Sequence, residues 1–470
     1  MARRAWVGAL LSLASCAVTP GSGETEMDWD RSVTPPSDAE ATQSRNSCTY
    51  EAGALPAETQ GQSYPSGDQI PIDHIVVLMQ ENRSFDHYFQ MLPQRGQPAA
   101  DVAPANFTNP GPDGAPEAIF HQTQPCFANT GHSWDATHEQ IDGGKMDGFV
   151  SSNEGKGDDV IDATLEGERA LGYYDDTDLP FYYWLAREFA LADRYFAAVP
   201  GPTWPNRMYL YAGSSYGRTV NVNFKPDATI FDHLVTRGVS FKVYFSDTGA
   251  MGDFLTGLLP EPSTQRQPLA QYFADAAAGK LPAVSFVNAT FDAPEAMATW
   301  EHPPSVPQLG QRFVAEVIAA LMKSPNWSSS ALFFAYDEHG GLFDHVAPPR
   351  ACPPDAHAPE LQPHDRPGKF DQLGVRVPMM VISPFAKKHH VSHEVYDHTS
   401  ILRFIEARFV LPALTARDAN ALAPWDMFDF SAPSFATPPT LTLPEVDAAA
   451  VARCAELHPE KPGVRSETAQ

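Results

Sequence analysis

The stretch that most constrains the fold of this chain is residues 72–89, IDHIVVLMQENRSFDHYF. Its apolar run, Ile75 to Met79, is continuous rather than alternating and has the length of a strand, which is typical of a parallel strand covered on both faces. The polar residues Glu81 to Ser84 then fall at the carboxyl end of that strand, where open α/β sheets bind ligands. A polar loop after a strand is also ordinary, so the prediction of a ligand site needs a second stretch of the same kind.

Residues 331–346, ALFFAYDEHGGLFDHV, provide that second stretch, because another apolar run breaks into acidic residues. Carboxylates that lie close together repel one another unless a cation neutralises them, and oxygen ligands suit a hard divalent ion such as Mg, Ca or Mn. The sequence therefore predicts one divalent metal ion, with ion pairs to neighbours such as Arg83 as the alternative. The predicted ligands come from the two strand ends: Glu81, Asn82, Asp337 and Glu338.

Helical and extended segments alternate along the middle of the chain, which indicates βαβ units and an α/β fold with one large, mostly parallel sheet flanked by helices. Length alone would allow two or three domains in 470 residues, but no repeat or linker divides the sequence. We expect one catalytic domain over residues 68–430 and a Pro- and Ala-rich extension, 431–470, packed on it. Predicted helices are 179–189, 230–236, 268–278, 311–322 and 400–409, and predicted strands are 75–79, 189–196, 240–245, 283–287, 331–336 and 377–382.

The N-terminus predicts export. Two arginines precede a short apolar segment and the sequence Leu13-Ala14-Ser15-Cys16, which resembles a bacterial lipoprotein signal peptide. We expect a signal peptide over residues 1–16, a lipid on Cys16, and a location in the cell envelope at the outer membrane or periplasm. An ordinary cleaved signal peptide, giving a secreted protein, is the alternative. Residues 17–67 are rich in Ser, Thr, Pro, Gly and acidic residues, so we expect a disordered tether.

The remaining four cysteines agree with export, since an even number suits two disulfides in an oxidising compartment. Three pairings of Cys48, Cys126, Cys352 and Cys454 are possible. The pairing of Cys48 with Cys126 and of Cys352 with Cys454 closes the shorter loops and is favoured.

The net charge of the chain argues against strongly anionic partners. The chain has 32 Lys and Arg against 58 Asp and Glu, a formal charge of −26. An excess of negative charge of this size argues against nucleic acid, or a strongly anionic membrane, as the main partner.

Residues 199–207, VPGPTWPNR, lead into a helical sequence. A hydroxyl residue followed closely by proline marks a helix N-terminus, so Thr203 would lie where backbone N–H groups and the helix dipole favour an anion. A plain capping threonine is the alternative. A metal ion beside such a threonine would suit phosphoryl transfer, because it lowers the pKa of the hydroxyl and neutralises phosphate charge. Three histidines in polar settings could donate to a phosphate, although a lone histidine is usually structural: His132, His302 and His398.

Four motifs occur in a fixed order: ENRSFDHYF at 81–89, PTWPNR at 202–207, EHPP at 301–304 and DEHGGLFDHV at 337–346. This series is similar to that of the bacterial phospholipase C and acid phosphatase family, which plant non-specific phospholipases C share and which has an alkaline-phosphatase-like fold. The resemblance implies that Thr203 is the nucleophile and forms a phospho-enzyme. It also implies that His132 and His302 contact the phosphate, and that the metal ligands are those proposed above. His398 matches no site residue of the family.

The sequence thus predicts an exported, metal-dependent phosphoesterase. Phospholipase C activity, which would cleave glycerophospholipids to diacylglycerol and a phosphorylated headgroup, is the first expectation. An acid phosphatase that acts on phosphomonoesters is the alternative within the same chemistry, and a catalytically inactive surface lipoprotein is the alternative from another class. The expected partner is a phospholipid or another phosphate ester, and no nucleic acid.

Overall fold

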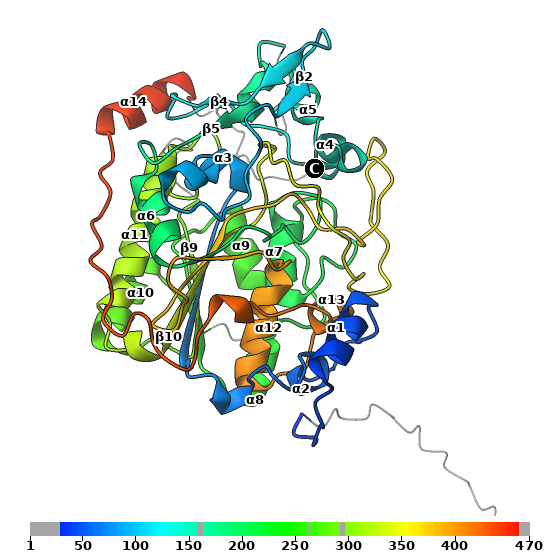
Figure 1. Cartoon of the computed structure of the whole chain (residues 1–470), viewed down its shortest axis with the longest axis vertical. Coiled ribbons are helices and arrows are strands. Elements are labelled where there is room, and N and C mark those ends of the chain that lie inside the picture. The colour runs from blue at the N-terminus through cyan, green and yellow to red at the C-terminus, as the bar shows by residue number, and fades with distance from the viewer. Residues whose placement is uncertain (1–28, 158–162, 261–263, 292–296, 460–470) are drawn as a thin grey trace, which may run out of the picture.

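The computed structural model describes residues 29–157, 163–260, 264–291 and 297–459 (Figure 1). The predicted signal peptide, the lipid on Cys16 and the first part of the tether lie outside these residues. Among the helices that are described, none is both long and apolar enough to cross a membrane.

The centre of the molecule is a sheet in which eight described strands have the order β12-β6-β11-β10-β1-β9-β7-β8. β11 runs antiparallel to both of its neighbours, and the other strand pairs are parallel. The prediction of a large, mostly parallel α/β sheet is therefore confirmed. The strands are β1 (His74–Gln80), β6 (Ala190–Ala192), β7 (Phe241–Tyr244), β8 (Arg266–Gln267), β9 (Val284–Asn288), β10 (Ser330–Tyr336), β11 (Met379–Ile382) and β12 (His390–Ser392).

The two strands with polar ends are parallel neighbours. Their register places Gln80 of β1 beside Tyr336 of β10. From Ile75 onward in β1, and throughout β10, side chains are at most 2% exposed, as expected of strands covered on both faces. Because both strands end at the same level, Glu81 and Asp337 leave the sheet side by side.

Helices cover both faces of this sheet (Figure 1). In that view α6, α10 and α11 lie to the left of the central strands, and α7, α8 and α12 lie to the right. Smaller elements, including α3, α4, α5 and two short β-ladders, lie beyond the carboxyl ends of β1 and β10. The short strands are β2 (Thr108–Pro110), β3 (Pro116–Ala118), β4 (Phe120–His121) and β5 (Gly172–Tyr173). The helices are α1 (Asp38–Asn46), α2 (Pro56–Thr59), α3 (Phe85–Phe89), α4 (Trp134–Ile141), α5 (Phe149–Asn153), α6 (Pro180–Glu188), α7 (Thr203–Ala212), α8 (Ile230–Arg237), α9 (Ala250–Gly257), α10 (Leu269–Ala278), α11 (Pro307–Met322), α12 (His398–Phe409), α13 (Ala416–Ala419) and α14 (Ala448–Leu457).

The prediction that residues 17–67 form a disordered tether is wrong for residues 29–67, which are folded. α1 begins with a capping box formed by Ser37 and Glu40. At its end, the buried side chain of Arg45 donates hydrogen bonds to the backbone carbonyls of Thr59 and Gln60. The segment is held by capping and by hydrogen bonds from a buried arginine rather than by an apolar stripe, which explains why its composition suggested disorder.

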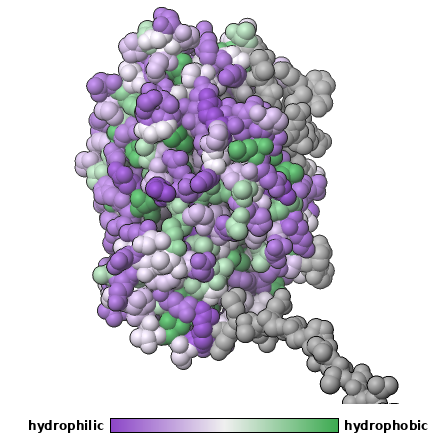
Figure 2. All heavy atoms as spheres, turned by 90° about the vertical axis from the view of Figure 1, so that its right-hand side faces the viewer, coloured by the Kyte–Doolittle hydropathy of each residue, from purple (hydrophilic) through white to green (hydrophobic). Residues whose placement is uncertain are grey.

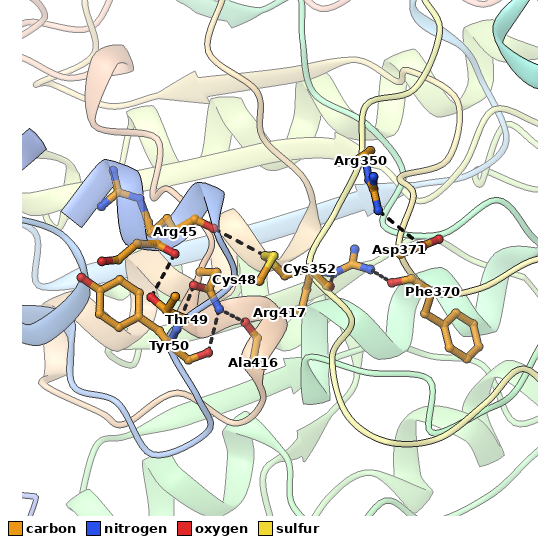
Figure 3. The surroundings of a disulfide bond; sticks show 12 residues. Arg45, Cys48, Thr49, Tyr50, Arg350, Cys352, Phe370, Asp371, Ala416 and Arg417 are labelled. Atoms are coloured by element: carbon orange, nitrogen blue, oxygen red, sulfur yellow. Dashed lines mark hydrogen bonds and ion pairs between the residues drawn. A yellow bond between two sulfur atoms is a disulfide. The ribbon is translucent and has the colours of Figure 1, made fainter. Parts of the chain in front are cut away.

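The favoured disulfide pairing is also wrong. Cys48 is bonded to Cys352 and Cys126 to Cys454. Figure 3 shows the first bond, which joins the N-terminal segment to a loop that Arg417 also holds through the backbone carbonyls of Cys352 and Phe370. Loop length is a poor guide here, because the fold pairs each cysteine with one that is more than 300 residues away.

Reduction of the disulfides should destabilise the protein. Because each bond closes a loop of more than 300 residues, removing one by a double Cys→Ser substitution should lower the free energy of unfolding by about 2–5 kcal/mol. Guanidinium unfolding of the wild type and of the Cys48→Ser/Cys352→Ser variant, both without reductant, would measure the loss. Equal midpoints would contradict a stabilising role for this bond.

The described end of the chain lies against the body of the molecule. Trp327 and Arg312 donate hydrogen bonds to the backbone carbonyls of Phe435 and Pro444, and α14 is attached through the Cys126–Cys454 bond. Figure 2 shows another face, the right-hand side of Figure 1, where hydrophilic residues dominate and hydrophobic residues lie in small separate groups.

Candidate active site

The ends of β1 and β10 form the floor of the candidate site. The backbone N–H of Asn82 donates to Asp337 Oδ1 at 3.2 Å, and the N–H of Glu338 donates to the same oxygen at 2.7 Å. Glu81, Asn82, Asp337 and Glu338 are at most 1% exposed. The two parallel strands thus bring three carboxylates and one amide into a buried cluster.

The loop after β10 is shaped to fit closely around Asn82. Asn82 has a φ of 65°, in the left-handed region that asparagine tolerates better than most residues. Gly340 also has a positive φ, and a Cβ at this position would lie 2.3 Å from the carbonyl oxygen of Asn82. Only glycine fits there, which gives a physical reason for the Gly in the sequence DEHGG.

Thr203 is the first residue of α7, with Pro202 as the preceding cap residue. Its hydroxyl donates to Glu81 Oε1 at 2.9 Å and is 2% exposed. The backbone N–H of Trp204 donates to Asn221 Oδ1, which satisfies one of the free N–H groups of the first turn. The hydroxyl of Thr203 therefore points at a predicted metal ligand, in contrast to the alternative of a simple capping threonine.

Two of the three candidate histidines join this cluster. His132 Nε2 lies 3.1 Å from Asn82 Nδ2 and 3.7 Å from Glu338 Oε1. Its Nδ1 contacts the backbone carbonyl of Thr130, which assigns the proton to Nδ1. The ring of His302 packs edge-on against that of His132, with centroids 5.3 Å apart.

The structure thus links all seven residues that the sequence predicts as site residues: Glu81, Asn82, His132, Thr203, His302, Asp337 and Glu338. His398 occupies a different position, behind β10. Its two ring nitrogens contact the backbone carbonyl of Asp337 and the hydroxyl of Tyr195. His398 therefore supports the strand end rather than facing the cluster, and the roles of the other seven stay predictions.

Arg207 is a site residue that the sequence argument missed. Its Nε donates to Asp337 Oδ2 at 2.9 Å, and its Nη2 lies 3.8 Å from Glu81 Oε2. The alternative cation considered from the sequence, Arg83, instead donates to the backbone carbonyl of Glu301. Arg207 could have been found, because it lies four residues after Thr203 and so on the same face of the predicted helix.

Burial and neighbouring charges set the protonation of this cluster. Burial raises the pKa of Asp337 to about 7, against the opposing effect of the Arg207 charge. Burial, followed by the neighbouring His132, lowers the pKa of His302 to about 3. His302 is therefore neutral at neutral pH, and its Nδ1 contacts the backbone carbonyl of Pro303 at 2.6 Å. The other nitrogen, Nε2, then carries the lone pair.

Comparison with known proteins decides the family. The sequence profile of the Phosphoesterase family matches residues 72–412. The chain belongs to the phosphoesterase family. This phosphoesterase is 34% identical over 408 residues to the non-specific phospholipase C6 of Arabidopsis thaliana. The aligned region covers 80% of this chain and 76% of the relative. The phosphoesterase is 30% identical over 456 residues to phospholipase C B of Mycobacterium tuberculosis, with 84% and 85% of the two chains covered.

Solved structures show a weaker similarity. A protein of the alkaline phosphatase superfamily from Vibrio parahaemolyticus has a TM-score of 0.37 at 12% identity, with 89% of this chain and 94% of that chain covered. The lipoteichoic acid synthase LtaP of Listeria monocytogenes has a TM-score of 0.38 at 8% identity, with 81% and 82% covered. Scores at this level carry no argument about the phosphoesterase. The family match and the sequence relatives instead establish a hydrolase that acts on phosphoester bonds.

The family, together with acidic groups in the structure, suggests a divalent metal ion. In the described residues, two groups of three have ligand atoms within 4.8 Å of one another: Asp86, Asp344 and His345, and His121, Asp175 and Asp178. The predicted ligands belong to neither group. In the first group the buried guanidinium of Arg376 donates to both carboxylates, so an internal cation already offsets part of their charge.

The predicted ligands fit a metal on other grounds. In the described part of the phosphoesterase, Asn82 Oδ1 is a buried acceptor without a hydrogen-bond donor, while its amide nitrogen is occupied by His132. A buried acceptor of this kind is costly unless a donor or a cation satisfies it. Oxygen donors alone suit a hard divalent ion, so Glu81, Asn82, Asp337 and Glu338 would hold it.

Replacement of Arg207 by glutamine should both destabilise and inactivate the phosphoesterase. It would leave the buried carboxylates of Glu81 and Asp337 without their internal cation, a change that costs about 3–5 kcal/mol in comparable buried pairs. Urea unfolding and a phosphoester assay would measure the two effects. Arg207→Lys, which keeps the charge but not the planar fork, should recover part of the stability. An Arg207→Gln variant as stable as the wild type would contradict this role.

Proposed function

We propose that this phosphoesterase is a metal-dependent phospholipase C that cleaves glycerophospholipids through a phospho-threonine on Thr203. The observation that carries the proposal is the hydrogen bond from the Thr203 hydroxyl to Glu81, at the N-terminus of α7 and within the buried acidic cluster. A nucleophile needs a group that accepts its proton and an environment that stabilises the phosphate charge. The names of several relatives, which are phospholipases C of plants and bacteria, support the choice of lipid substrate.

In the proposed first step, Thr203 Oγ1 attacks phosphorus and its proton passes toward Glu81. The phosphorus–oxygen bond to diacylglycerol breaks, and the leaving alkoxide takes a proton from Nε2 of His132 or His302, which that ring must first have bound because its resting proton is on Nδ1. In the second step, the same histidine accepts a proton from the water that attacks the threonine ester, and Glu81 returns its proton to the threonine oxygen, which releases the phosphorylated headgroup and restores the hydroxyl. A bound divalent ion would supply charge neutralisation for the phosphate oxygens and would lower the pKa of the Thr203 hydroxyl.

The loop around His132 fixes the orientation of its ring. Its Nδ1 is fixed by the carbonyl of Thr130, and the hydroxyl of Thr130 donates in turn to the carbonyl of Gly340. Gln140 on α4 donates to the carbonyl of Gly131 at 2.7 Å. These contacts hold the imidazole against Asn82 and Glu338, as a residue that contacts phosphate requires.

A substrate panel tests the proposed activity. Purified protein supplied with Mg, Ca or Mn would be assayed on phosphatidylcholine vesicles for diacylglycerol release and on p-nitrophenyl phosphate for monoester cleavage. We expect diester cleavage with or without monoester cleavage. Monoester cleavage alone would replace the lipase by an acid phosphatase, and neither activity in a folded, metal-loaded protein would favour an inactive lipoprotein.

Export and lipid attachment are part of the same proposal, since a phospholipase C meets its substrate at a membrane. The sequence Leu13-Ala14-Ser15-Cys16 and the two disulfides support it. Mass spectrometry of the full chain produced in a bacterial host should show a mature N-terminus at Cys16 that carries a lipid. An unmodified N-terminus after a cleaved signal peptide would instead indicate a secreted protein.

A further inference from the structure

We propose that Glu301 positions His302 for phosphoryl transfer and couples it to both strands that carry the site. The inference rests on the proposed function for the importance of His302. Glu301 directly precedes His302 in the EHPP motif, and its side chain is fully buried. The donors that its carboxylate accepts from are not predicted site residues, so Glu301 acts through its neighbour as a positioning residue.

The carboxylate of Glu301 is an acceptor for four donors from four different elements. Tyr88 of α3 donates to Oε2 at 2.5 Å and Tyr336 of β10 donates to the same oxygen at 2.8 Å. Tyr182 of α6 and the amide of Gln80 of β1 donate to Oε1, the latter at 3.0 Å. The three tyrosine side chains are all fully buried.

Two of these donors directly precede predicted metal ligands. Gln80 is followed by Glu81 and Tyr336 by Asp337, and neighbouring residues of a strand point to opposite sides. At each strand end, one residue therefore binds Glu301 while the next one enters the site. Glu301 thus ties three site residues to one point: Glu81, Asp337 and His302.

The backbone of Glu301 is fixed as firmly as its side chain. Its φ is 76°, in the left-handed region, which costs a residue with a Cβ about 1–3 kcal/mol. Arg83 donates to its carbonyl oxygen through Nε at 2.8 Å and Nη2 at 2.5 Å. On the other side, a Cβ on Gly310 would lie 2.1 Å from Glu301 Cγ. A strained backbone held by so many contacts is typical of a functional position, and here it sets the direction of His302.

Chemistry explains why this residue is a carboxylic acid. Burial raises the pKa of Glu301, and the hydrogen bonds from the three tyrosines and Gln80 oppose that shift. An ionised carboxylate has acceptor sites for all four donors. Glutamine has the same shape but offers only one acceptor oxygen, so donors that now share Oε1 and Oε2 would have to turn away.

The test compares Glu301→Gln with Glu406→Gln, which changes another fully buried carboxylate that is paired with Arg403. Both variants should lose stability, measured as a fall in Tm. Only Glu301→Gln should lower kcat on p-nitrophenyl phosphate or phosphatidylcholine, by about 100-fold, because misplacing a group by about 1 Å can cost that much. KM should change little.

A second pair of variants makes smaller changes, so that loss of activity cannot be confused with misfolding. Tyr182→Phe removes one donor to Glu301, and Tyr272→Phe removes a buried hydroxyl that donates to the carbonyl of Val317. We expect kcat to fall about 3–10-fold in the first variant and to stay within twofold in the second, since one of several positioning bonds is lost. Equal kcat for wild type and both Glu301→Gln and Tyr182→Phe would overturn the proposal.

The ring resonances of His302 give a readout that does not depend on turnover. In ¹⁵N-labelled protein, His302→Ala would assign the ring signals, and Glu301→Gln should shift them while Glu406→Gln leaves them in place. If the wild type cleaves no phosphate ester, the proposed function fails, but a shifted His302 signal still supports the positioning role. Unshifted signals in folded Glu301→Gln would overturn it.

Discussion

Thr203→Ala should abolish phosphoester turnover while the protein remains folded. Loss of the hydroxyl removes the only atom that can form the proposed phospho-enzyme, so kcat should fall by roughly 10⁴-fold or more, as when a covalent nucleophile is removed. Stability should change by only about 1 kcal/mol, because one hydrogen bond to Glu81 is lost. Mass spectrometry of acid-quenched enzyme should show a peptide in which Thr203 carries the phosphorylated headgroup after reaction with phosphatidylcholine, or phosphate after reaction with p-nitrophenyl phosphate, and no such adduct in the variant.

A matched control is available at Thr229. This threonine is also buried, but it caps α8, with its hydroxyl 2.8 Å from Asp232. Thr229→Ala should cost about 1 kcal/mol of stability and leave kcat unchanged. If Thr203→Ala kept wild-type turnover, or if phosphate were trapped on another residue, Thr203 would be removed from the mechanism.

Removal of the metal ion should inactivate the enzyme reversibly. Dialysis against a chelator should abolish activity, and Mg, Ca or Mn should restore it, because Glu81, Asp337 and Glu338 would otherwise face the phosphate as a negative cluster. Binding to the folded state should also raise Tm, since a ligand at 100 times its Kd stabilises by about 2.7 kcal/mol. The rise in Tm is a readout that does not require turnover.

The Asn82→Gly variant tests metal binding in a protein that should still fold. Glycine accepts the positive φ of this position, so the backbone can keep its shape while the side-chain oxygen is lost. The variant should fold but show a smaller rise in Tm on metal addition than the wild type. Full activity in a wild-type sample shown to be metal-free by elemental analysis would refute the metal site.

The central sheet and the strand ends of the site could be predicted because their pattern is local. The apolar run of Ile75 to Met79 and the run before Asp337 are continuous, which is typical of buried parallel strands. Parallel neighbours end at the same edge, so their polar residues had to meet. The order of the four motifs then assigned Thr203, His132 and His302 to the same site. The structure brings these three residues together.

Other features were out of reach because they depend on contacts between distant segments. The position of Arg207 on the same helix face as Thr203 was readable, but its pairing with Asp337, 130 residues away, could not be read from a local pattern. Glu301 was seen only as part of the EHPP motif, since its partners come from α3, α6 and two strands. The fold of residues 29–67 was missed for the same reason: its anchors are a buried arginine and a disulfide, not an apolar period.

The disulfides have a consequence for proteolysis. One joins residues 48 and 352 and the other joins 126 and 454, so the two covalent loops overlap. A single cut anywhere between residues 48 and 454 lies inside at least one of them, and the two fragments stay joined. A nicked molecule would therefore run at full length on a non-reducing gel and separate only after reduction. Such a chain, cut once in an exposed loop, keeps all of its parts.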